Sequence, residues 1–304
     1  MTSNSPFTFY LDWKVGAQFA GLFSAHANGL YEEAGLKVDL VPWLEDARSI
    51  HEKVVREAGR GELCAGCAED NLIVRQAARD GSVLAFGAML QEPPLVLMSR
   101  PERGIRNIGD LRGKRVGMHP DGIRALEIIL ALEGIRLSEL TIHEVGFDLE
   151  HLRQDRFDAL QGYTMTEPVQ LARLGLKVAT LPIEHPRLKP YAQVYFSERH
   201  LLRNRPAELA AFLAASNAGW LSVCADPDSA ARLIAEMMGT PTKAAEQREM
   251  LERVIPLVTG GRPIEQIGTI EPTQWRRNLD TYTEFGLVDR PVDFDEIVFD
   301  IQLG

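Results

Sequence analysis

The chain has 304 residues, and its 33 basic and 43 acidic residues give a formal net charge of −10. Length alone predicts about two domains. A content of 45% hydrophobic and 25% charged residues is typical of a globular protein and excludes disordered, collagen-like and disulfide-stapled chains. The acidic balance argues against nucleic acid or an anionic membrane surface as the main partner, because both attract basic patches.

The start of the sequence shows no targeting signal. The segment from Met1 to Leu11 has no basic region, no apolar region and no lipobox cysteine. We therefore expect a cytoplasmic protein, and the alternative is a periplasmic protein whose signal is missing from this sequence. No stretch reaches the ~18 to 20 apolar residues of a membrane span, so we expect no membrane insertion.

The three cysteines are Cys64, Cys67 and Cys224. They are too few for a disulfide framework and fit a reducing compartment. Cys64 and Cys67 form a CxxC motif, and Glu69 follows closely. We favour small buried residues here, because cysteine packs well in a core. The alternative is metal or redox chemistry with Cys64, Cys67 and Glu69 as weak metal-ligand candidates, although no second CxxC completes a zinc site.

Strand and helix patterns alternate along the first part of the chain. Strands are predicted over Phe7–Trp13, Leu36–Trp43, Leu63–Ala68 and Val83–Leu90, and helices over Gln18–Gly35, Asp46–Ala58 and Asn71–Arg79. This βαβαβ order predicts a parallel sheet with helices on both faces.

A second α/β segment follows the break at Gln91–Pro94. Its predicted strands are Leu95–Ser99, Arg115–His119, Thr141–Val145, Ala159–Tyr163 and Lys177–Ile183, and its helical segments are Ile108–Leu111, Gly122–Leu132, Leu149–Phe157 and Glu167–Leu174. Four helices are predicted after it, over Pro206–Cys224, Asp228–Met238, Lys243–Leu257 and Thr273–Phe285. They have no sheet of their own, so they must cover sheets formed earlier in the chain.

These elements predict an α/β protein of two lobes. Lobe I comprises residues 1–92 plus 196–304 and is discontinuous, and lobe II is the inserted segment 93–195. In such folds ligands bind outside the carboxyl ends of parallel strands. We therefore expect the ligand in a cleft between the lobes.

Residues just after the predicted strands are the site candidates of lobe I. Asp12 and Trp13 end the first strand, where the indole offers a flat face for a ring and the carboxylate can accept hydrogen bonds from ring N–H or amino groups. Glu69, Asp70 and Asn71 follow the third strand and begin a helix. The alternatives are a core tryptophan with a capping aspartate, and acidic residues that merely suit the helix dipole.

A strand–turn–helix junction in lobe II is a further candidate. His119, Asp121 and Gly122 lie there, with Arg124 in the first turn, and free N–H groups at such a helix start can bind phosphate or carboxylate. The junction has neither the GxxxxGK[ST] of a P-loop nor the GxGxxG of a dinucleotide site. His119 is either a donor to the ligand or a structural histidine.

The last candidates, Tyr163 and Glu167, lie at the end of another strand of lobe II. An aromatic face beside a carboxylate suits a heterocycle with amino substituents. The enzyme motifs HExxH, GxSxG and DxDxDG do not occur in the sequence.

The segment LDWKVGAQFAGLFSAHANGLYEEAGL, from Leu11 to Leu36, resembles the opening of a known family. That family contains thiamine-pyrimidine synthase and the pyrimidine- and alkanesulfonate-binding proteins of ABC importers. Ile108–Gly117, Asp158–Pro168 and Arg205–Phe212 are similar to further motifs of the family, in the same order. The resemblance covers most of the chain and implies a type II periplasmic-binding-protein fold.

In the pyrimidine binders of that family, the ring stacks on aromatic side chains and a carboxylate binds its amino group. The resemblance implies these roles for Trp13, Tyr163 and Glu167, and it adds Gln18 of the opening motif to the ligand-binding candidates.

The enzyme branch of the family forms the thiamine pyrimidine phosphate from pyridoxal phosphate and one of its own histidines, with iron. This sequence departs from that branch at two places. Ala68 and Leu72 stand where the lysine and histidine are expected, and Tyr191–Phe196 replaces a cysteine-rich CCCFC segment. The chemistry of the branch is therefore not carried over to this chain.

The main hypothesis is a protein that binds an aminopyrimidine thiamine precursor or a related heterocycle. The alternatives are a cytosolic synthase-like enzyme with a non-standard site, and a desulfinase or decarboxylase on the same fold, with Cys64, Cys67 and His119 as catalytic candidates. Pyridoxal phosphate, iron or zinc is a cofactor only under the enzyme hypothesis. The expected partner is a small molecule, an ABC permease is a partner only of an exported protein, and a homodimer stays open.

Overall fold

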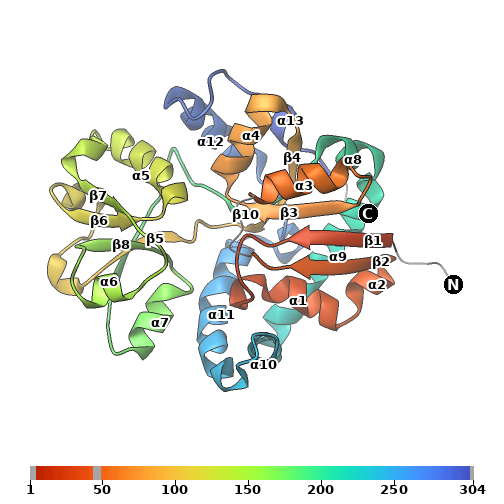
Figure 1. Ribbon diagram of the computed structural model, residues 1–304, viewed down its shortest axis with the longest axis horizontal. Helices are drawn as coiled ribbons and strands as arrows, with labels where there is room; N and C mark the ends of the chain where they lie inside the picture. Colours follow the sequence, from red (N-terminus) through yellow and green to blue (C-terminus); the bar gives the residue numbers. More distant parts are fainter. Residues whose placement is uncertain (1–4, 44–48, 302–304) are drawn as a thin grey trace. The chain divides into compact units, whose positions relative to one another are not determined.

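A computed structural model describes residues 5–43 and 49–301, apart from the side chains of Asp121 and Glu265. The chain divides into two compact units, one formed by Met1–Glu92 with Tyr191–Gly304 and the other by Pro93–Pro190. Each unit contains one five-stranded sheet with helices around it (Figure 1). The α/β class predicted from the sequence is confirmed.

The sheet of the first unit has the strand order β2-β1-β3-β10-β4. Its strands are β1 (Ser5–Tyr10), β2 (Leu36–Val41), β3 (Cys64–Ala68), β4 (Val83–Leu90) and β10 (Ala192–Glu198). β1 pairs in parallel with β2 and β3, whereas β10 pairs antiparallel with β3 and β4. The prediction of a purely parallel sheet is wrong, because the late strand β10 is inserted between β3 and β4.

Aromatic packing on one face of β1 fixes the register of this strand in the sheet. Phe7 and Phe9 alternate with less buried residues, so both point to the same face of the sheet. The ring of Phe212 stacks on them, with centroid distances of 4.6 Å to Phe7 and 4.7 Å to Phe9. A register shift of one residue would turn both phenylalanines away from this contact.

The helices that follow β1 differ from the prediction at one glycine. Instead of one helix over Gln18–Gly35, the chain forms a short 3₁₀ turn, α1 (Ala20–Ala27) and α2 (Leu30–Glu33). Gly29 separates the two helices because its φ of 73° lies in the left-handed region, which a continuing α-helix does not allow.

The next two helices lie close to their predicted bounds. α3 (Ile50–Ala58) begins after Ser49, whose side chain forms a capping box with Glu52. Residues 46–48 of the predicted helix lie outside the described residues. α4 (Asp70–Asp80) follows β3 and ends at a left-handed glycine.

The C-terminal part of the chain is helical, as predicted, and belongs to the first unit. Its helices are α8 (Arg199–Asn204), α9 (Pro206–Ala225), α10 (Pro227–Met237), α11 (Ala244–Thr259), α12 (Pro272–Glu284) and α13 (Phe294–Ile297). In the described part of the chain, α9 alone has the length and apolar composition of a membrane span, which corrects the expectation that no segment does. Its residues Phe212 and Trp220 are fully buried in the first unit, and core helices of this kind pass the same test.

The sheet of the second unit has the strand order β7-β6-β8-β5-β9. The strands are β5 (Leu95–Ser99), β6 (Arg115–Met118), β7 (Thr141–Glu144), β8 (Ala159–Tyr163) and β9 (Ala179–Pro182), and the α-helices are α5 (Pro120–Leu132), α6 (Glu150–Arg153) and α7 (Glu167–Arg173). β6 is parallel to β7 and β8, and β5 is antiparallel to β8 and β9. α6 is shorter than predicted.

The second boundary between the units lies at Pro190 and not at residue 195 as expected. Residues 192–195 are part of β10, which pairs with β3 and β4 in the sheet of the first unit. The sequence analysis did not assign a strand here, and the residues between Tyr191 and Phe196 were therefore placed in the wrong lobe.

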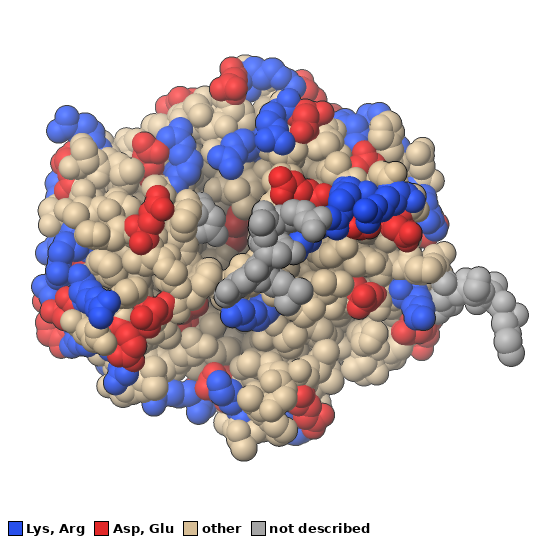
Figure 2. All heavy atoms as spheres, viewed as in Figure 1, with Lys and Arg blue, Asp and Glu red and all other residues tan. Residues whose placement is uncertain are grey.

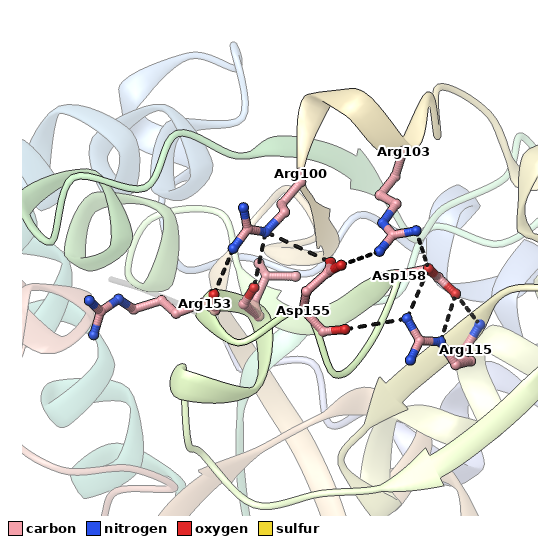
Figure 3. Close-up of polar contacts among 7 residues, drawn as sticks. Arg100, Arg103, Arg115, Arg153, Asp155 and Asp158 are labelled. Atoms are coloured by element: carbon pink, nitrogen blue, oxygen red, sulfur yellow. Dashed lines mark hydrogen bonds and ion pairs between the residues drawn. The ribbon is translucent and has the colours of Figure 1, made fainter.

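A network of arginine and aspartate side chains joins β5, β6 and β8 in the second unit (Figure 3). Asp158 accepts hydrogen bonds from the backbone N–H of Arg115 at 2.9 Å and from its Nε at 3.2 Å, and it forms an ion pair with Arg103 at 3.1 Å. Burial opposes the charge, but the bonds from Arg115 outweigh it and lower the pKa of Asp158. The first residue of the motif Asp158–Pro168 is therefore a structural anchor.

Charged side chains of both signs are interspersed on the face of the molecule that Figure 2 shows. Lys and Arg do not gather there into one basic field. This distribution agrees with the argument from net charge against a polyanionic partner.

Candidate functional site

Polar residues of the first unit meet at the edge of the sheet where β1 and β3 end. Asp12 and Trp13 follow β1, Glu69 follows β3, and Gln193 lies at the start of β10. Because β3 lies between β1 and β10 in the sheet, these residues are neighbours although they are far apart in sequence. We call Asp12, Trp13, Glu69, Asn71 and Gln193 the strand-end cluster.

The carboxylate of Asp12 forms the centre of this cluster. Its Oδ1 accepts a hydrogen bond from the Cys67 thiol at 3.5 Å, and its Oδ2 accepts one from Nε2 of Gln193 at 3.4 Å. The side chain of Asp12 is half-buried. The arrangement holds an acceptor group in place at the end of β1, and its role toward a ligand stays a prediction.

Trp13, the residue after Asp12, belongs to an aromatic pair. The rings of Trp13 and Trp43 are stacked, with centroids 5.3 Å apart and planes at 19°. The ammonium group of Lys14 lies 5.7 Å from the ring centroid of Trp13 and 5.9 Å from that of Trp43. Trp13 is half-buried and not a fully buried core residue. A flat aromatic surface and a hydrogen-bond acceptor are thus adjacent in the chain.

Asp70 has internal partners that the sequence could not reveal. It is 1% exposed and accepts hydrogen bonds from the backbone N–H of Tyr191 at 3.0 Å, from Nδ2 of Asn278 at 3.3 Å and from the hydroxyl of Tyr282 at 2.7 Å. Burial raises the pKa of Asp70 to about 6, although these bonds favour the charged form. We interpret Asp70 as an anchor between α4, α12 and the chain before β10.

The first N–H groups of α4 are used within the protein. The groups of residues 70, 72 and 73 donate to the carbonyl oxygens of Tyr191 and Glu69. A helix start binds anions through free N–H groups. These three groups are therefore not free for an anion, although the sequence pattern of acidic residues at a helix start does not show that.

Gln193 is the member of the cluster that sequence analysis missed. It is 1% exposed, and its Oε1 lacks a hydrogen-bond partner, as does Oδ1 of the buried Asn71. The only signal in the sequence was its position in Tyr191–Phe196, where the chain departs from the cysteine segment of the enzyme branch. Gln18, by contrast, is buried in the 3₁₀ turn before α1, and the adjacent Ala17 N–H donates to Gln247.

The CxxC cysteines do not act together. Both lie on β3, three residues apart, so their side chains point to opposite faces of the sheet. The Cys64 thiol donates to the carbonyl oxygen of Val54, whereas the Cys67 thiol donates to Asp12. Within the described residues, no group of three or more His, Cys, Asp and Glu side chains is arranged to hold a metal ion. The proposed ligand set with Glu69 therefore does not come together.

The environment of both thiols also opposes nucleophilic chemistry. Burial raises the pKa of Cys64 to about 12, and burial together with the neighbouring Asp12 charge raises that of Cys67 well above its usual value. Thiolates, and not thiols, are the reactive species. This geometry favours the structural alternative for both cysteines.

Alkylation with iodoacetamide at pH 8 should distinguish the three cysteines. We expect half-buried Cys224 to react and Cys64 and Cys67 to react roughly 100-fold more slowly, because both are buried and protonated. Peptide mass spectrometry measures each rate, and the denatured protein, in which all three should react, is the control. A rate for Cys67 equal to that of Cys224 would contradict this assignment.

In the second unit, the His119 N–H and the Arg124 side chain at the junction before α5 have partners within the protein, although the sequence predicted groups available to a ligand there. The His119 N–H donates to Oε1 of Gln161 at 3.0 Å, and Arg124 forms an ion pair with Glu127. A Cβ on Gly122 would lie 2.3 Å from the same Gln161 oxygen, so a larger residue there would displace the Gln161 amide. Asp121 lies in the first turn of α5, and its side chain is outside the described part.

His119 instead contacts an exposed aromatic side chain. Its ring packs edge-on against Phe147, with centroids 4.1 Å apart, and Phe147 is 55% exposed. A single exposed phenylalanine is normal on a protein surface, so this contact does not by itself indicate a ligand site. The role of His119 toward a ligand stays a prediction.

Glu167 begins α7 and bonds back to the end of the preceding strand. Its carboxylate accepts a hydrogen bond from the backbone N–H of Tyr163 at 2.7 Å, which holds the end of β8 against the start of α7. Burial raises the pKa of Glu167, although its bonds to backbone N–H groups oppose this shift. The structure brings Tyr163 and Glu167 together as predicted, and ligand binding by either stays a prediction.

Comparison with known proteins defines the class of protein. The fold is that of the type II periplasmic binding proteins, as in the aliphatic sulphonate binding protein SsuA from Escherichia coli, with a TM-score of 0.69 at 18% identity over 98% of this chain and 93% of that one. The family described as NMT1/THI5 like matches residues 16–230, and the chain belongs to this family. The resemblance found in the sequence is thereby confirmed.

Two curated relatives differ in what their names say they do. The riboflavin-binding protein RibY from Chloroflexus aurantiacus is 23% identical over 95% of this chain and 83% of its own length. The 4-amino-5-hydroxymethyl-2-methylpyrimidine phosphate synthase from Schizosaccharomyces pombe is 23% identical over 74% of this chain and 67% of its own length. The family and the fold thus support small-molecule binding and leave the ligand open.

Proposed function

We propose that this protein binds a small nitrogen heterocycle that carries N–H donors, with an aminopyrimidine related to the thiamine precursor as the first candidate. The observation that carries this proposal is the Asp12 carboxylate, held at the end of β1 by donors from β3 and β10. Trp13 is the next residue in the chain, and its half-buried ring, stacked on Trp43, is an aromatic group suited to stacking with a heterocycle.

Hydrogen-bond chemistry favours such a ligand over an anion. Asp12 and Glu69 are negatively charged, and the free oxygens of Asn71 and Gln193 are acceptors. The N–H groups of residues 70, 72 and 73 at the start of α4 are already bonded within the protein, so they do not attract a sulfonate or phosphate. A ligand that donates hydrogen bonds therefore matches this edge, whereas a sulfonate does not.

A synthase-like or desulfinase-like enzyme fits these residues less well. The Cys64 and Cys67 thiols are buried and protonated, and the described side chains form no cluster suited to iron or zinc. Ala68 and Leu72, where the enzyme branch is expected to have lysine and histidine, offer neither an amine for pyridoxal phosphate nor an imidazole. We derive no catalytic step from these groups.

Location and assembly follow as further parts of the proposal. The expectation is a cytoplasmic protein that delivers or stores its ligand, and an ABC permease is a partner only if the protein is exported. A homodimer is the alternative to a monomer, and a measurement of the molecular mass in solution distinguishes the two.

The test is a binding screen with 4-amino-5-hydroxymethyl-2-methylpyrimidine, riboflavin and the sulfonate MOPS. The aminopyrimidine should raise the melting temperature, since a ligand at 100 times its Kd stabilises a protein by about 2.7 kcal/mol. Asp12→Asn should weaken binding about tenfold in calorimetry, because half of the acceptor becomes a donor. Asp110→Asn, a half-buried site in the second unit outside the strand-end cluster, is the matched control. Binding of MOPS with no response to either heterocycle would contradict the proposal.

A further inference from the structure

Gln193 has a backbone conformation that glutamine rarely adopts. Its φ is 48°, and within the described backbone Asp155 is the one other residue besides glycine with a positive φ. The left-handed region crowds the Cβ of any L side chain, and glycine would adopt it without cost. Such strain at a buried position indicates that the side chain itself is needed there.

The orientation of the Gln193 amide follows from its neighbour. The Asp12 carboxylate can only accept hydrogen bonds, so the NH₂ group faces Asp12, and it donates to Oδ2 at 3.4 Å. The opposite orientation would bring two oxygens together. Oε1 of Gln193 therefore points away from Asp12 and has no partner among the described residues.

Among the described residues, no group donates a hydrogen bond to this oxygen. The single hydrogen of the Cys67 thiol is directed to Asp12. Val194 pairs with Ala68, so Gln193 lies at the end of the ladder beside Glu69, whose carboxylate is an acceptor. Asn71, two residues beyond Glu69, has a second buried oxygen without a partner. A buried acceptor of this kind is costly unless something donates to it.

We infer that Gln193 is a specificity-determining residue whose Oε1 accepts a hydrogen bond from an exocyclic amino group of the ligand. This inference rests on the proposed function and deepens it, because it names the feature of the heterocycle that is recognised. The ligand class is a heterocycle with an exocyclic amino group, which donates to Gln193 and to the Asp12 carboxylate. An analogue with an oxygen in place of that amino group would set acceptor against acceptor.

The experiment compares two ligands that differ in this one group. Calorimetry measures the Kd of 4-amino-5-hydroxymethyl-2-methylpyrimidine and of its 4-oxo analogue for the wild type and the variants. The wild type should prefer the amino compound by about 100-fold. Gln193→Gly, which removes the amide and relieves the backbone, should fold and lower this preference about tenfold. Gln193→Met keeps the length of the side chain without an acceptor and should do the same, so the test does not depend on one variant.

Asp155→Gly is the matched control, because Asp155 has the same backbone conformation with φ of 57° and lies in the second unit, outside the strand-end cluster. It should leave the preference for the amino compound unchanged. If the wild type binds both pyrimidines equally, or if both Gln193 variants keep the wild-type preference, the inference is overturned while the proposed function stands. If the wild type binds neither pyrimidine nor any other heterocycle, the proposed function fails and this inference fails with it.

Discussion

Replacing Gly219 with alanine is expected to destabilise the first unit by about 3 kcal/mol or more, a loss of roughly 10 °C in melting temperature. Gly219 lies in α9, where this helix packs against α1. A Cβ at this position would lie 2.1 Å from the backbone oxygen of Gly21 and 2.8 Å from the Cβ of Ala25. The obstacle is backbone, so the two helices would have to separate.

The sign of this effect is opposite to helix propensity. Alanine is better than glycine in a helix interior by about 1 kcal/mol, so an isolated α9 would be stabilised. The loss arises from the helix contact, which also brings the Trp220 ring to within 2.3 Å of a Cβ on Gly21. Gly21→Ala should therefore destabilise the protein as well.

Calorimetry and urea denaturation measure both effects. Gly146→Ala is the matched control, because its added Cβ meets nothing within 4 Å and it should change stability by no more than about 0.5 kcal/mol. A melting temperature of Gly219→Ala within 2 °C of the control, with 2 °C taken as about the precision of the comparison, would show that the helices can move apart freely.

Asp70 should make the stability of the protein fall as the pH rises from about 4 to about 6. Its pKa is raised from 3.8 to about 6 because the carboxyl is buried. The folded state therefore binds the proton more tightly than the unfolded state, and stability that is present below the unfolded pKa is lost as pH rises through the folded pKa. The shift corresponds to a loss on the order of 3 kcal/mol.

Asp70→Asn should remove this component. The difference in unfolding free energy between the wild type and the variant is expected to be largest near pH 4 and to shrink toward pH 7. Other carboxyl groups cancel in this difference, because they are present in both proteins. Asp70→Ala should be worse at every pH, since it leaves the donors of Tyr191, Asn278 and Tyr282 buried without an acceptor.

Asp110 provides a control of opposite sign. The backbone N–H groups of Arg106 and Asn107 bond to its carboxylate and lower its pKa. The wild type should therefore gain stability over Asp110→Asn as the pH rises through the acid range. Urea denaturation of the variants from about pH 2 to about pH 7 measures the differences, because the lowered pKa of Asp110 places its titration below pH 4. If the difference in unfolding free energy between the wild type and Asp70→Asn stays constant across this range, the pKa of Asp70 is not raised in the folded state.

Much of the fold was predictable because the strand segments are locally marked. β4, β5 and β8 lie within the predicted bounds, since each is a short apolar run between polar residues or glycines. The order of the strands was not predictable in the same way. β10 is apolar too, but its place between β3 and β4 depends on pairing with strands more than 100 residues earlier.

The candidate site was predictable in part for a similar reason. Asp12 and Trp13 follow directly from the end of β1, so position along the chain was sufficient to select them. The opposite orientations of Cys64 and Cys67 were also implied by the two-residue period of a strand, and the CxxC spacing obscured this. Gln193 had no local signal, because a positive φ is not a preference of glutamine.

The sequence by itself determined which segments are strands and helices, where the strands end, and the family to which the chain belongs. The elements and the strand ends depend on residues that are neighbours in the chain, and the family is identified by motifs that occur in the same order. Only the tertiary structure decided that, of the adjacent residues Glu69, Asp70 and Asn71, the middle one is bonded to a helix some 200 residues away. It likewise decided that Gln193 lies beside Asp12, because burial and hydrogen-bond partners depend on contacts between segments that no local pattern records.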